Sequence, residues 1–108
     1  MDEDLLFRAL ADPVRRKLLD RLRAEPGQAL GALIDGLPMT RQAASKHLAV
    51  LEAANLVAIV RRGREKLHYL NPVPIQQIAA RWIGAFERER VAALVELKAQ
   101  LESEDGEA

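Results

Sequence analysis

Cysteine is absent from this chain of 108 residues, and aromatic residues make up only 4% of it. Without cysteine there is no disulfide, no thiolate metal site and no cysteine nucleophile. Because aromatics are scarce, we expect a core built from Leu, Val, Ile and Ala. The apolar runs are only a few residues long, which is too short to span a bilayer. The acidic start at residues 1–4 is unlike a signal peptide, so we expect a cytoplasmic protein.

The net charge is zero, but the charge is unevenly distributed along the chain. Residues 38–70 carry a net charge of +4, and residues 71–108 carry −3. A basic middle favours a nucleic-acid partner, although a chance cluster on a solvated surface would give the same count. The length fits one domain, predicted at residues 1–101, with an acidic, frayed tail at residues 102–108.

The hydrophobic pattern predicts four helices, a β-hairpin and a long last helix. Asp12 is an N-cap followed by Pro13 at the first helical position. Thr40 caps the fourth helix, and Asn55 ends it in a left-handed conformation. The resulting fold is mainly α with a small β-hairpin, in the order of a winged helix-turn-helix. The predicted elements are helices at residues 3–10, 13–23, 29–35 and 40–54, strands at residues 56–61 and 66–70, and a helix at residues 75–101.

The third and fourth predicted helices are joined by only residues 37–39, as in a helix-turn-helix whose second helix enters the DNA major groove. At 100° per residue, Gln42, Ser45, Lys46 and Ala49 share one face of this recognition helix. That face carries no acidic residue and can approach phosphates and base edges closely. An ordinary solvated face normally mixes both signs of charge, so the pattern favours DNA binding. The opposite face should pack inward through Ala44, Leu48 and Leu51.

Basic residues cluster at the hairpin, where Glu65 is the only acid between Arg61 and Tyr69. Such a turn either is exposed to solvent without a partner or contacts the phosphate backbone of DNA. Its position directly after a helix-turn-helix favours the DNA contact. We expect Gly63 to take a positive φ angle at a four-residue turn, residues 62–65. The predicted DNA-binding residues are Thr40, Arg41, Gln42, Ser45, Lys46, His47, Arg61, Arg62 and Arg64.

Two segments resemble the ArsR family of winged helix-turn-helix repressors: FRALADPVRR at residues 7–16 and SKHLAVLEAANLV at residues 45–57. The second is similar to the family's recognition-helix motif, and Arg62-Gly63-Arg64 and Tyr69-Leu70 resemble its wing. The resemblance implies a homodimeric transcription regulator, usually a repressor of its own operon that an effector releases from DNA. Asn55 stands where the family usually has Gly, and Asn is compatible with the same backbone turn.

Metal sensing is the family's best-known property, and this chain departs from it. The resemblance places a thiolate site in residues 30–37, which hold no Cys, and a second site on the last helix, which holds no His. His47 and His68 lack evident carboxylate partners, so we expect both to be structural or, for His47, to touch a phosphate. The sequence therefore predicts a member with no metal and no cofactor, whose effector is unknown.

The last helix carries more apolar residues than a small monomer needs, which predicts a homodimer formed by the first and last helices. No nucleophile triad, glycine-rich phosphate loop or metal triad indicates an enzyme. A winged-helix module that binds another protein instead of DNA remains the alternative. The predicted dimer-interface residues are Leu5, Leu6, Ile78, Trp82, Phe86, Leu94 and Leu97.

Overall fold

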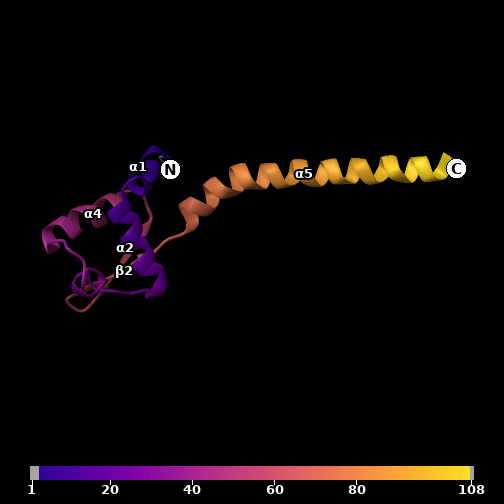
Figure 1. Ribbon diagram of the computed structural model, residues 1–108. Coiled ribbons are helices and arrows are strands. Elements are labelled where there is room, and N and C mark those ends of the chain that lie inside the picture. Colours follow the sequence, from indigo (N-terminus) through magenta and orange to yellow (C-terminus); the bar gives the residue numbers. More distant parts are fainter. Residues whose placement is uncertain (1–2, 108) are drawn as a thin grey trace. The chain divides into compact units, whose positions relative to one another are not determined.

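The computed structural model describes residues 3–107, and side chains as far as residue 103 (Figure 1). The chain divides into two compact units, residues 1–74 and residues 75–108, and each is described by itself. Among the described residues, no helix is both long enough and apolar enough to cross a membrane. The elements are α1 (Glu3–Leu10), α2 (Pro13–Ala24), α3 (Leu30–Leu33), α4 (Arg41–Ala53), β1 (Val57–Arg62), β2 (Glu65–Leu70) and α5 (Val73–Glu107).

This order confirms the seven predicted elements, while several ends differ. The helix α3 has only four residues. The turn of the hairpin is shorter than predicted, because Arg62 pairs with Glu65 and leaves two central residues. Gly63, with φ at 63°, is the first of them, the position that glycine takes in type II′ turns. The helix α5 begins before residue 75 and continues through residues 102–107 of the predicted tail, and Ala108 lies outside the described residues.

The predicted helix caps are confirmed. A carboxylate oxygen of Asp12 accepts hydrogen bonds from the backbone N–H groups of Val14 and Arg15, at 2.8 and 3.2 Å. The Thr40 hydroxyl accepts from the N–H of Ala43 at 3.0 Å. Asn55 has a φ of 61°, as its role in ending α4 requires. The Asp12 and Thr40 side chains satisfy N–H groups that the first turn of a helix leaves unpaired.

The core of the first unit is aliphatic, as the composition predicted. Leu6 is only 1% exposed, so this residue of the predicted dimer interface already packs within its own chain. Each buried leucine side chain contributes roughly 1.5–3 kcal/mol to stability. The buried apolar residues are Leu6, Ala9, Leu18, Leu19, Leu22, Leu33, Ala44, Leu48, Leu51, Ala54, Leu56 and Val57.

The hairpin is joined to the helices by a pairing that the sequence did not predict. The backbone N–H of His68 donates to the carbonyl of Gln28 at 2.9 Å, and the N–H of Gly27 donates to the carbonyl of His68 at 2.9 Å. The Gln28 side chain in turn donates to the carbonyls of Arg21 and Glu25 at the end of α2. The hairpin is therefore anchored to the α2–α3 connection.

Candidate nucleic-acid interface

The recognition helix α4 presents the face that its sequence predicted. Gln42, Ser45, Lys46 and Ala49 are all exposed. On the other side, Ala44, Leu48 and Leu51 are at most 5% exposed and pack into the core. Burial of this apolar side fixes which residues of α4 face outward. The exposed side carries hydrogen-bonding and basic groups at helical spacing, which suits base edges and phosphates.

The exposed face of α4 and the hairpin share one hollow. Arg41 and Ser45 of α4 line it together with Arg64 and Lys66, and its volume is about 530 Å³. Residues about twenty positions apart in the sequence thus line one concave surface, which we call the α4–hairpin hollow. Its lining carries Arg41, Arg64 and Lys66 against Glu52 and Glu65, and a concave surface with an excess of positive charge attracts an anion. The other predicted basic residues, Lys46, Arg61 and Arg62, are exposed but do not line this hollow.

The strand register shows an unfavourable charge pair in the hairpin. Arg61 lies directly opposite Lys66, whereas Arg62 lies opposite Glu65. Like charges directly opposite each other destabilise a two-stranded sheet, and an anion between them relieves the repulsion. Directly opposite residues of an antiparallel pair share a face, so Arg61 is on the same face of the hairpin as Lys66, which lines the hollow. Lys66 is thus a functional candidate that the sequence-based list of DNA-binding residues omitted.

Two features of the hollow could not be read from the sequence. Arg41 lies against Gly31 of α3, with its Nη1 only 3.4 Å from where a glycine Cβ would stand. A Cβ atom at position 31 would therefore be in van der Waals contact with the Arg41 guanidinium. The acids Glu52 and Glu65 also line the hollow, so its lining carries both signs of charge.

The two histidines have different environments. His68 is 4% exposed, and its Nδ1 lies 2.8 Å from the carbonyl oxygen of Gln28. Because a carbonyl only accepts, this Nδ1 donates, which agrees with the predicted packing beside the hairpin. His47 is half-buried, and its Nδ1 lies 3.4 Å from Nη1 of Arg15. Among the side chains that the structure describes, residues 3–103, no three of His, Asp or Glu gather in a group that could hold a metal ion.

A helix-turn-helix followed by a basic hairpin, with both lining one concave surface, defines a DNA-binding protein of the winged helix-turn-helix class. A family model described as "Helix-turn-helix domain" matches residues 10–60. The chain is 34% identical to the ArsR-like transcriptional regulator from Rhodococcus sp. RHA1, whose structure it matches with a TM-score of 0.66 over 87% of this chain and 90% of the other. The chain belongs to the ArsR family of transcriptional regulators.

Curated relatives agree with this assignment. The uncharacterized HTH-type transcriptional regulator YuzN of Bacillus subtilis is 36% identical over 76% of this chain and 96% of its own length. The transcriptional repressor SdpR of the same organism is 31% identical over 66% of this chain and 78% of its own length. The protein is therefore a DNA-binding transcriptional regulator and not an enzyme.

Proposed function

We propose that this protein is a homodimeric repressor that binds a palindromic operator, with α4 in the major groove and the hairpin on the phosphate backbone. The observation that carries the proposal is the α4–hairpin hollow, where Arg41 and Ser45 of the recognition helix meet Arg64 and Lys66 of the hairpin. The outward face of α4 supplies base-reading groups, and the hairpin supplies phosphate contacts.

Base reading is assigned to Gln42 and Ser45, and phosphate binding to Arg41 and Lys46. All four side chains are exposed. A glutamine side chain can form two hydrogen bonds with adenine, whereas a lysine carries a point charge that suits a phosphate. Thr40 keeps its hydroxyl hydrogen available for a phosphate, because its oxygen is the acceptor in the helix cap.

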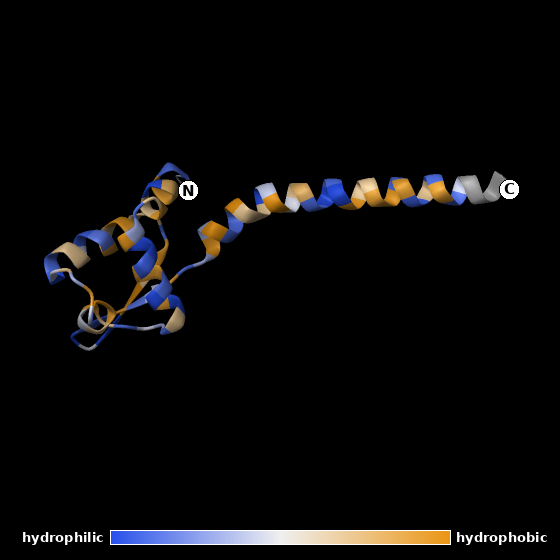
Figure 2. Cartoon of the chain, viewed as in Figure 1, coloured by the Kyte–Doolittle hydropathy of each residue, from blue (hydrophilic) through white to orange (hydrophobic). Residues whose placement is uncertain are grey.

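The dimer is supported by the apolar residues of α5, which recur along the helix as the orange segments of Figure 2. Phe86, Leu94 and Leu97 are 59%, 57% and 51% exposed, and Leu5 of α1 is 36% exposed. A repeated apolar stripe of this size is typical of a surface that a second copy covers. Two recognition helices related by a twofold axis would meet half-sites about 34 Å apart, which requires a palindromic operator.

Repression and a cytoplasmic location complete the proposal. Similarity to the repressor SdpR supports the sign of regulation. A bacterial transcription regulator acts on the chromosome, which lies in the cytoplasm, and this supports a cytoplasmic location for the protein.

A mobility-shift titration tests the function. The protein is mixed with DNA from upstream of its own gene, and with a random fragment of the same length, at several salt concentrations. We expect tighter, salt-sensitive binding to the upstream fragment. A properly folded protein that shifts neither fragment would contradict the proposal and favour the protein–protein module.

A further inference from the structure

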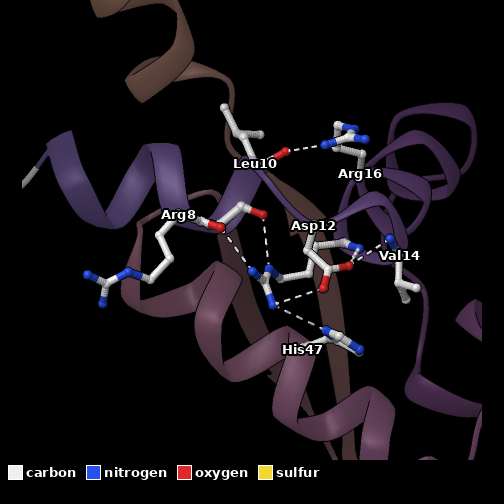
Figure 3. Close-up of polar contacts among 8 residues, drawn as sticks. Arg8, Leu10, Asp12, Val14, Arg16 and His47 are labelled. Carbon is white, nitrogen blue, oxygen red and sulfur yellow. Dashed lines mark hydrogen bonds and ion pairs between the residues drawn. The ribbon is translucent and has the colours of Figure 1, made fainter.

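Arg15 of α2 joins three helices through one guanidinium group (Figure 3). Its Nε and Nη2 donate to the backbone carbonyls of Ala9 and Arg8 in the last turn of α1, both at 2.9 Å. Its Nη1 lies 3.7 Å from a carboxylate oxygen of Asp12 and 3.4 Å from Nδ1 of His47 on α4. The Arg15 side chain is only 14% exposed, so this arrangement is held within the fold.

The chemistry of this contact selects one tautomer of the neutral His47 ring. A guanidinium has donors only, so the Nδ1 atom of His47 has to accept, and the proton of the neutral ring is on Nε2. Among the described residues, His47 is also the only α4 residue whose side chain hydrogen-bonds to another helix. The other contacts of α4 with the core are made by apolar side chains, whose attraction has no preferred direction.

We propose that Arg15 is a positioning residue for the DNA interface, which acts through His47 to set the rotation of α4 about its own axis. A hydrogen bond is directional, and it therefore selects one orientation among those that the apolar core would tolerate. Gln42, on the same helix, depends on this orientation to reach a base edge. His47 is thereby assigned a contact with the protein itself, in place of the phosphate contact that its sequence position predicted. The inference rests on the proposed binding of operator DNA.

Substitutions at His47 separate the two roles of its ring. In His47→Asn the amide oxygen stands near the original Nδ1, so Arg15 keeps an acceptor while the Nε2–H donor is lost. In His47→Leu the side chain has a similar volume, but both the acceptor for Arg15 and the Nε2–H donor are lost. We expect His47→Leu to weaken operator binding about tenfold, by loss of one charge-assisted hydrogen bond, with little change on random DNA. His47→Asn should recover most of this loss.

The outcomes distinguish this inference from its rivals. If His47→Asn and His47→Leu weaken binding to operator and random DNA alike, His47 contacts a phosphate and the inference is wrong. Equal operator binding by wild type and a folded His47→Leu variant also overturns it. Wild-type protein that fails to prefer the operator contradicts the proposed function instead.

A double-mutant cycle and a measurement without DNA complete the test. Arg15→Gln combined with His47→Leu should bind the operator no more weakly than Arg15→Gln alone, whereas independent roles would multiply the two losses.

Nitrogen NMR of the His47 ring in the free protein should show the Nε2-protonated tautomer in wild type and a mixture of both tautomers in Arg15→Gln. A mixture of the two His47 tautomers in wild type would refute the proposed hydrogen bond between Arg15 and His47, even if a variant fails to fold.

Discussion

The phenolic oxygen of Tyr69 lies 2.9 Å from the position that a Cβ atom on Gly27 would occupy. Gly27 also has a φ of 79°, in the left-handed region that residues with a Cβ disfavour. Glycine is thus required here for two reasons, its backbone conformation and the close approach of Tyr69. Both belong to the junction where the backbone of Gly27 pairs with that of His68.

Replacing Gly27 with alanine should destabilise the protein by more than the backbone conformation alone accounts for. The left-handed conformation costs about 1–2 kcal/mol for a residue with a Cβ, and Tyr69 has to move in addition. Gly36 is a matched control, because its φ is 78° and nothing lies within 4 Å of its Cβ position. In urea unfolding, Gly27→Ala should lose more stability than Gly36→Ala. Equal losses would show that Tyr69 adapts without cost.

Asp12 should make stability depend on acid pH. The backbone N–H of Arg15 is the main cause that lowers the pKa of Asp12 below its ordinary value of 3.8. Because the folded pKa is the lower one, the charged carboxylate stabilises the fold above about pH 4, and this contribution is lost as the pH falls through the folded pKa. In Asp12→Asn the cap acceptor remains but the charge is gone. The stability difference between wild type and variant should therefore narrow on acidification, and a constant difference down to pH 2 would contradict the assignment.

Gln42→Ala should relax sequence preference more than it lowers general DNA affinity. Two hydrogen bonds to an adenine supply about 1–3 kcal/mol of discrimination against other bases. Binding to operators randomised at each position should show the loss at one position per half-site. Lys46→Ala is the comparison, and it should weaken operator and random DNA alike. If Gln42→Ala does the same, Gln42 reads no base.

The opposed pair Arg61 and Lys66 should contribute to the salt dependence of DNA binding. Replacing both with alanine would remove up to about four phosphate contacts per dimer and flatten the slope of log affinity against log salt by up to about 3.6. The hairpin itself should lose no stability, because a like-charge pair is removed. Arg62→Ala is the comparison, and it should flatten the slope less than the double variant, since Arg62 lies opposite Glu65 across the strands. An unchanged slope in the folded double variant would show that Arg61 and Lys66 contact no phosphate.

A negative charge on the exposed stripe of α5 should dissociate the proposed dimer. Phe86 is 59% exposed, and Val60 of the hairpin is similarly exposed at 51%. Phe86→Asp would place a charge in the proposed interface, where it has to be desolvated without a partner. Light scattering at micromolar concentration should then give a monomer for Phe86→Asp and a dimer for Val60→Asp and wild type. A stable wild-type monomer would exclude the dimer.

Sequence alone determined the elements of this protein and the outward face of α4. Caps such as Asp12 and Thr40, and the left-handed Asn55, act on neighbours within a few residues, so their effects can be read locally. The inward side of α4 follows from helical periodicity, because its apolar residues have to leave water. The resemblance to the ArsR family rested on these same local segments.

Only the tertiary structure decided which distant residues meet. The hairpin's junction brings His68 to Gln28, forty positions away, and the α2–α4 contact brings His47 to Arg15, thirty-two positions away. The register that sets Arg61 opposite Lys66 depends on a turn two residues shorter than the pattern predicted. Such contacts depend on how whole elements pack and pair, and side-chain spacing within one element carries no information about them.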